Sequence, residues 1–307
     1  MTTKPETKQQ AESTLTTTNR RLTDWYRRFI ASGASRIGIY SVLGVYLVWT
    51  VFPVYWMLTG TLKNRRELLA SPPYLIPPNP DFGSWFELFV AREDFLQYII
   101  NSFIVTTATT VAVVILGTMA TYGLVKFDFP RDAGEFWIPF GTLATRFLPP
   151  IIMVIPVFII FQNINIINSY ISLILTYSAF TIPFVVWMMV GFFQELPDSI
   201  VEAAIIDGHT HFGAFFKLVL PVVKPGLIAS TIFVLITSWN ELLFAVVLTQ
   251  TLDAQTLPVA LATFDQQFQT NWELLTVASS VAMLPPMAFA FLVRDQLVRG
   301  FTMGAVN

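Results

Sequence analysis

The sequence contains no cysteine, which excludes disulfide bonds, thiolate metal ligands and cysteine nucleophiles. It has only two histidines, His209 and His211, so a metal site built from several imidazoles is excluded as well. Charged residues make up 12% of the 307 residues, whereas a soluble domain usually carries about 25%. The formal net charge of −2 gives no strong basic field, which argues against nucleic-acid binding.

Hydrophobic residues make up 54% of the chain, and the mean hydropathy is +0.61. A chain this apolar cannot bury its apolar surface inside a globule that faces water, so we expect it to lie in a lipid bilayer. A spanning helix needs about 20 mostly apolar residues. Six stretches meet that requirement, which predicts an all-α membrane protein with six transmembrane helices. The six stretches are residues 37–62, 98–122, 136–161, 170–193, 225–249 and 274–293.

Residues 1–36 are polar and too long for the basic cap of a cleaved signal peptide. We expect them to form a partly disordered cytoplasmic tail, and residues 37–307 to form one six-span domain. Residues 20–36 mix five arginines with apolar side chains. This pattern fits a short interfacial helix, but a basic flank that only orients the first span is the more ordinary interpretation.

The basic residues predict the orientation of the spans. With both ends of the chain in the cytoplasm, the inner segments hold 13 of the 18 lysines and arginines, and the outer loops 162–169 and 250–273 hold none. The positive-inside rule therefore favours cytoplasmic termini. The basic cluster at residues 63–66 disagrees with this orientation and is outvoted by the N-terminal flank.

The predicted spans contain many prolines, which kink helices by removing a backbone donor. Kinked helices around a cavity suit a transporter, although proline is also generally commoner in membrane helices than in soluble ones. The prolines in question are Pro53, Pro139, Pro149, Pro150, Pro156, Pro183, Pro285 and Pro286.

The longest inner loop, residues 194–224, has a helical pattern of its own. Pro197 provides a helix start, and Gly208 allows the chain to turn. A second helix is expected from about Thr210 to Val219, with Pro221 ending it. The sequence therefore predicts a helix–turn–helix on the cytoplasmic face. On the residues alone, such an amphipathic loop is more often ordinary packing than a docking element.

This loop resembles the EAA loop of ABC-importer permeases. The family pattern is E-A-A, three residues, G, nine residues, an aliphatic residue, any residue and L-P. The sequence gives Glu202-Ala203-Ala204, then Gly208, and then Leu220-Pro221 at the same spacing. Other segments are similar to the carbohydrate-uptake branch, the relatives of the maltose-transporter permease. These segments are Asn101-Ser102, Trp239-Asn240-Glu241, residues 256–259 and the C-terminal residues 299–306.

The resemblance implies the type I ABC-importer permease fold, with a cytoplasmic coupling helix that docks on an ATPase. It implies four kinds of protein partner or cargo: a homologous second permease, a dimer of ATP-binding subunits, an extracellular solute-binding protein and a sugar. ATP and Mg would be bound by the partner ATPase, and this chain would bind no cofactor. The location implied is the plasma membrane of a prokaryote. The residues expected to couple to the ATPase are Glu202, Ala203, Ala204, Asp207, Gly208, Leu220 and Pro221.

Asn240 and Glu241 lie in the fifth predicted span, where a charged side chain is costly. They fit two roles equally well: a pair that lines the transport path and binds sugar hydroxyls, or a structural hydrogen bond between helices. Arg146 in the third span is expected to snorkel or to pair. These residue types name no particular sugar.

Other classes of protein fit the sequence less well. No stretch matches the Walker A pattern, since Ala214 stands where the lysine would follow Gly208 and Gly213, so the chain is not itself the ATPase. A secondary transporter would need midplane carboxylates, for which Glu241 is the main candidate. A membrane-embedded hydrolase would need a nucleophile and a base within the spans. His209 and His211, two apart, would point about 200° away from each other on a helix and form no metal face.

Overall fold

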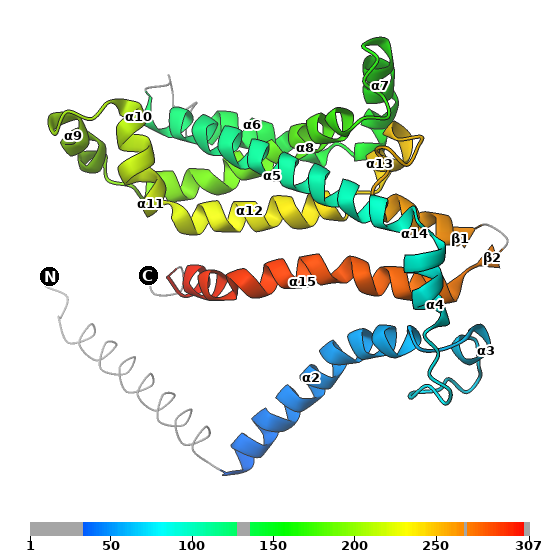
Figure 1. The fold of residues 1–307 in the computed structure, drawn as a ribbon. Helices are drawn as coiled ribbons and strands as arrows, with labels where there is room; N and C mark the ends of the chain where they lie inside the picture. Colours follow the sequence, from blue (N-terminus) through cyan, green and yellow to red (C-terminus); the bar gives the residue numbers. More distant parts are fainter. Residues whose placement is uncertain (1–32, 128–135, 267–268, 304–307) are drawn as a thin grey trace, which may run out of the picture. The chain divides into compact units, whose positions relative to one another are not determined.

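The computed structural model describes residues 33–127, 136–266 and 269–303, and these residues are almost entirely helical (Figure 1). The only strands among them are β1 (Asp265–Gln266) and β2 (Gln269–Thr270), which pair antiparallel. The chain divides into two compact units, Met1–Thr59 and Gly60–Asn307. The N-terminal tail, up to residue 32, and the Gly304-Ala305-Val306 part of the C-terminal motif lie outside the described residues.

The first unit contains the helix α2 (Gly33–Gly60), which includes Pro53. Its segment Ile37–Gly60 has 24 residues and is long and apolar enough to cross a membrane. This helix confirms the first predicted span to within a few residues.

The second unit holds the remaining helices. From the outer loop to the fourth predicted span they are α3 (Arg65–Leu68), α4 (Gly83–Phe86), the π-helix η1 (Glu87–Ala91), α5 (Phe95–Lys126), α6 (Ile138–Ala144), the 3₁₀-helix η4 (Thr145–Phe147), α7 (Pro150–Asn163) and α8 (Tyr170–Gln194). From the inner loop onward they are α9 (Asp198–Ile206), α10 (His211–Ala214), the π-helix η5 (Phe215–Val219), α11 (Leu220–Val222), α12 (Lys224–Trp239), α13 (Leu243–Leu248), α14 (Leu257–Phe264) and α15 (Trp272–Met303).

The helices α5 and α8 have the most extensive contact of the helix pairs in the described part of this unit and lie side by side (Figure 1). Small side chains allow that approach, since Gly117 on α5 faces Val185 on α8. Hydroxyl side chains also line the buried face, and those such as Thr110 and Thr121 donate to carbonyls one turn back in their own helix. Interfaces between membrane helices are generally enriched in such small residues.

Four described helices are each long and apolar enough to span a membrane, and the number reaches six if each of two bent pairs counts as one span. In α5, α8 and α15 the sequence prediction is confirmed. The third predicted span is instead broken, since Ile138–Phe147 and Pro150–Asn163 meet at 96°. Leu148 and Pro149 are extended there because neither Pro149 nor Pro150 has an N–H to continue the helix.

The fifth predicted span is also interrupted. The helix α12 ends at Trp239, residues 240–242 are irregular, and the short helix α13 follows. In the membrane, an irregular backbone is tolerated only where protein or a water-filled cavity surrounds it. At both interruptions, backbone N–H and C=O groups therefore need hydrogen-bond partners outside the helix.

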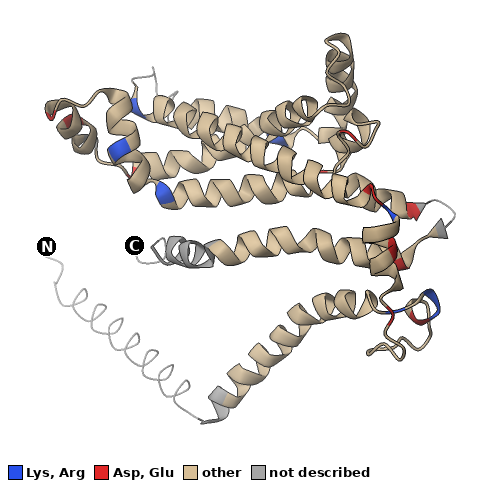
Figure 2. Cartoon of the chain, in the orientation of Figure 1, with Lys and Arg blue, Asp and Glu red and all other residues tan. Residues whose placement is uncertain are grey.

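Charged side chains gather at the two ends of the second unit, and the long helices between them are largely free of charge (Figure 2). One end carries the inner-loop helices α9 and α10. The other carries α3, α4, α14 and the β1–β2 pair, which assemble around the first turns of α15 through buried Leu88, Phe264 and Leu274. This distribution is the one expected for a protein whose middle lies in lipid.

Candidate functional site

The inner loop folds as the predicted helix–turn–helix. Pro197 precedes α9 with φ −60° and ψ 134°, and the helix ends at Ile206. Gly208 then adopts φ +85°, a left-handed conformation that glycine accepts without steric cost. The His209 N–H donates to the Ala204 carbonyl over 2.9 Å, which closes the turn. The turn at Gly208 is therefore a backbone requirement, as the sequence predicts.

Burial separates the predicted coupling residues of α9 into two groups. Ala204 is 1% exposed and packs inside the chain, whereas Glu202, Ala203 and Asp207 are exposed. Ile206, which the sequence analysis did not single out, is 85% exposed. The helix α9 thus holds itself against the protein through Ala204 and presents its other face outward.

The second half of the loop starts at Thr210, whose side chain accepts the Gly213 N–H over 3.1 Å and so caps α10. The π-helix η5 follows, and its Phe215 and Val219 are buried against α5 and α8. The helical segment continues one residue past Pro221, which was predicted to end it. Leu220 and Pro221 open α11, where a missing N–H is tolerated, and this helix ends at Val222. The chain then bends by 80° into α12.

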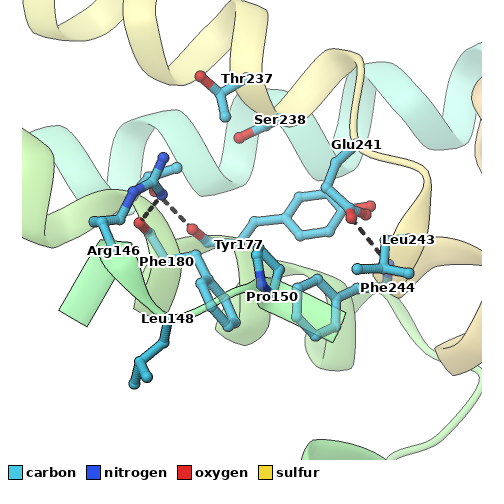
Figure 3. A pocket seen from close by; sticks show the side chains of 11 residues that line it. Arg146, Leu148, Pro150, Tyr177, Phe180, Thr237, Ser238, Glu241, Leu243 and Phe244 are labelled. Atoms are coloured by element: carbon cyan, nitrogen blue, oxygen red, sulfur yellow. Dashed lines mark hydrogen bonds between the residues drawn. The ribbon is translucent and has the colours of Figure 1, made fainter. Parts of the chain in front are cut away.

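A cavity of ≈ 230 Å³ lies where the third and fifth predicted spans are interrupted. Leu148 and Pro150 come from the break in the third span, and Ser238, Glu241 and Leu243 come from the break in the fifth (Figure 3). The remaining wall is mainly α8. The other lining residues are Arg146, Tyr177, Phe180, Thr181, Thr237 and Phe244.

Glu241 lies in the wall of this helix-break cavity, but its carboxylate is already bonded. One oxygen accepts the Phe244 N–H over 2.9 Å and the other accepts the Ala245 N–H over 3.1 Å. Glu241 therefore caps the first turn of α13, where the helix dipole also favours a negative charge. The cap explains locally why α13 restarts after the break.

Asn240 does not join Glu241 in the cavity wall. Its side-chain amide donates to the Ile236 carbonyl over 2.8 Å, at the end of α12, and its side chain is exposed. The structure thus separates the two residues that the sequence analysis paired. Both make structural bonds to their own chain segments, and the predicted role as sugar ligands stays a prediction.

Four polar residues of the cavity wall were not singled out from the sequence: Tyr177, Thr181, Thr237 and Ser238. The double proline at 149–150 was the available signal for a break, but nothing in the sequence shows that α8 lies across it. Arg146 was singled out, and its guanidinium donates to the Phe180 carbonyl on α8.

A second polar cluster lies near the N-terminal end of α5, within the Asn101-Ser102 motif. The fully buried Asn101 amide donates to the carbonyls of Leu252 and Gln255 over 2.7 and 2.8 Å. Its oxygen accepts from Gln97 over 2.7 Å and from the Tyr170 hydroxyl over 2.6 Å. The motif therefore fastens the outer loop between α13 and α14 to the helix bundle.

Comparison with known proteins defines the class of this fold. The family described as the binding-protein-dependent transport system inner membrane component matches residues 82–303. The chain belongs to this family. It is accordingly a multi-pass membrane protein.

Individual relatives are more specific. The chain is 34% identical to the trehalose transport system permease protein SugB of Mycobacterium tuberculosis over 279 residues, covering 90% of this chain and 99% of that one. It is 30% identical to the diacetylchitobiose uptake system permease protein DasC of Streptomyces coelicolor over 263 residues, covering 86% and 94%. The chain is therefore an ABC-transporter permease.

A solved structure supports the same fold. It is the crystal structure of a bacterial ABC transporter involved in the import of the acidic polysaccharide alginate. The TM-score is 0.72 over 86% of this chain and 98% of that chain, at 20% sequence identity. This likeness confirms the predicted type I importer permease fold.

Proposed function

We propose that this chain is the permease subunit of an ATP-driven importer of a sugar or sugar-like solute. It forms half of the translocation path, and a homologous permease forms the other half. A pair of ATP-binding subunits supplies the energy, with ATP and Mg bound there, and an extracellular binding protein delivers the solute. The chain does no covalent chemistry.

The observation that carries this proposal is the exposed face of α9. Ile206 is 85% exposed, and Ala203 beside it has no side chain beyond Cβ to keep a partner away. Glu202 and Asp207 provide carboxylates at the same surface. Exposed apolar surface rimmed by charge is typical of a protein interface, so this face fits a cleft in a partner subunit.

The inner loop is also built to transmit force. Phe215 and Val219 of η5 lie in one buried cluster with Val185 and Met189 of α8. A displacement of α9 therefore moves α10, η5 and α8 together, because packed cores shift as units. This connection supports the role of Leu220 and Pro221 as the far end of the lever, next to the 80° bend into α12.

The proposed orientation places α9 and both termini in the cytoplasm, in agreement with the distribution of lysine and arginine. In this orientation the helix-break cavity lies within the membrane, away from α9. The names of the relatives, which include trehalose and diacetylchitobiose transport, support a sugar as the solute. Alternating access follows as a shift between two packings that ATP and the loaded binding protein favour differently.

The test is copurification and transport. The tagged chain is expressed together with the homologous permease, the ATP-binding subunit and the binding protein, and ATP-dependent sugar uptake is measured in proteoliposomes. Replacing exposed Ala203 or Ile206 by arginine is expected to release the ATPase subunit and to abolish uptake while the permease stays folded. Uptake driven by an ion gradient without any ATPase would contradict the assignment.

Two controls make the result specific. Ala204→Arg places the same side chain on the same helix, but at a buried position, and is expected to unfold the loop as well as release the ATPase. Arg92→Gln removes a charge at the opposite end of the unit and is expected to leave the ATPase bound. If Ala203→Arg retained the ATPase and full uptake, α9 would not be the coupling helix.

A further inference from the structure

The helix-break cavity contains one cation and one carboxylate that do not form an ion pair with each other. Arg146 and Glu241 lie at opposite ends of the cavity in Figure 3. In the part of the chain that the structure describes, no carboxylate pairs with Arg146, and its acceptor is a neutral carbonyl, that of Phe180. Arg146 thus retains donors that no described acceptor uses, since a guanidinium has five N–H groups.

The negative charge of Glu241 is compensated locally. Its two oxygens accept the N–H groups of Phe244 and Ala245, and it lies at the positive end of the α13 helix dipole. Figure 3 shows the carboxylate turned towards Leu243 and Phe244 rather than towards Arg146. The formal charges of Arg146 and Glu241 cancel. Because the Glu241 carboxylate is already hydrogen-bonded, the charge that a ligand in the cavity meets is the positive charge of Arg146.

Neutral polar groups in the wall are also incompletely used. Ser238 is 5% exposed and Tyr177 is 3% exposed. The Ser238 hydroxyl makes no hydrogen bond with a described residue, whereas the Tyr177 hydroxyl faces the Glu241 carboxylate. A buried hydroxyl without a partner costs free energy, so the position of Ser238 beside a cavity points to a polar ligand that completes it.

From this arrangement we propose that the cavity binds the anionic group of an acidic sugar, such as a carboxylate, a sulfonate or a phosphate, with Arg146 as its principal ligand and Ser238 as a hydroxyl donor. The inference rests on the proposed function, because it specifies the class of solute that this path carries. A guanidinium binds the oxygens of such oxyanions through parallel, charge-assisted N–H donors.

The competing arrangement is a structural one, in which a carboxylate of the second permease pairs with Arg146 in the assembled importer. In that case Arg146 would affect assembly and would not distinguish acidic from neutral sugars. The two arrangements therefore differ in ligand selectivity, which can be measured directly on the complex.

The experiment uses the complete importer in lipid nanodiscs without nucleotide. Binding is measured by saturation-transfer difference NMR with four probes: D-glucose, D-glucuronate, D-glucose 6-phosphate and 6-deoxy-6-sulfo-D-glucose. At least one acid is expected to bind about tenfold or more tightly than glucose. Arg146→Gln is expected to remove that preference without changing glucose binding, and Arg146→Lys to keep part of it. Arg92→Gln, which removes an outer-loop charge, is the matched control and should leave the preference intact.

The proposal is overturned if no acid binds more tightly than glucose, or if Arg146→Gln leaves the preference unchanged. It is also overturned if Arg146→Gln lowers the yield of assembled importer and weakens all four probes alike, as the structural ion pair predicts. ATP-driven uptake of neutral sugars alone would overturn this inference and leave the proposed function in place. Acid binding without any ATP-driven uptake would overturn the proposed function and leave the assignment of the cavity's ligand in place.

Discussion

Gly117 on α5 faces Val185 on α8 so closely that a Cβ at position 117 would lie 2.8 Å from Val185 Cγ1. Real Cβ atoms essentially never approach another heavy atom that closely, and Val185 is fully buried. A valine side chain is also stiff, so it cannot turn aside at little cost. The contact between α5 and α8 therefore depends on the absence of a Cβ atom at position 117.

Gly117→Ala is expected to destabilise the permease, because one helix must shift to admit the methyl group. Overpacking of this kind costs about 1–3 kcal/mol. The measurement is thermal or SDS-induced unfolding in nanodiscs, followed by tryptophan fluorescence. Gly191→Ala is the matched control, because it lies on α8 with nothing within 4 Å of its Cβ. Equal stability of the two variants would contradict the close approach.

Gly208 offers a prediction about backbone conformation alone, since nothing lies within 4 Å of a Cβ at this position. Its φ of +85° is left-handed, and a side chain there costs about 1–2 kcal/mol. Gly208→Val is expected to disrupt the turn after α9 and to reduce uptake and ATPase binding. Gly208→Asn is expected to have a smaller effect, because asparagine tolerates this conformation better.

Gly208→Asn serves as the control for Gly208→Val, because both add a side chain but asparagine tolerates the left-handed conformation better. Hydrogen exchange over residues 198–210 should increase in the order wild type, Asn variant, Val variant. Identical exchange in all three proteins would mean that the turn does not need its left-handed residue.

Asn101 provides a test of the outer loop. Asn101→Asp keeps the shape of the side chain but removes the two donors to the carbonyls of Leu252 and Gln255. Each buried group left without its partner costs about 1–3 kcal/mol, and the carboxylate would also face two carbonyl oxygens. Faster hydrogen exchange at residues 252–257 and a lower unfolding temperature are expected. Asn163→Asp, at an exposed position at the end of α7, should change neither.

The sequence predicts the elements that depend on local composition. Runs of apolar residues locate α2, α5, α8 and α15, and Pro197 and Gly208 locate the ends of α9, because these features act within one turn of the chain. The burial of Ala204 was not predicted, because the sequence placed Ala204 with Ala203 among the residues that contact the ATPase, and only the structure packs it inside the chain.

Tertiary relationships account for what was missed. A double proline in an apolar run is compatible with either a kink or a complete break, and only packing against α8 decides between them. Asn240 and Glu241 are adjacent in sequence, yet one ends α12 and the other caps α13. Their separation depends on how three irregular residues turn, which no periodicity encodes.

Glu241 gives the last prediction, which separates a structural cap from a cargo ligand. Glu241→Gln keeps a single oxygen acceptor, so one of the N–H groups of Phe244 and Ala245 loses its partner. Faster hydrogen exchange of these two amides and a loss of stability of about 1–3 kcal/mol are expected. Glu241→Ala should expose both amides and cost more, whereas Glu195→Gln, at an exposed position after α8, should cost nothing measurable. If Glu241→Gln weakened sugar binding while amide exchange and stability stayed at wild-type values, Glu241 would act on the cargo and the cap would be incidental.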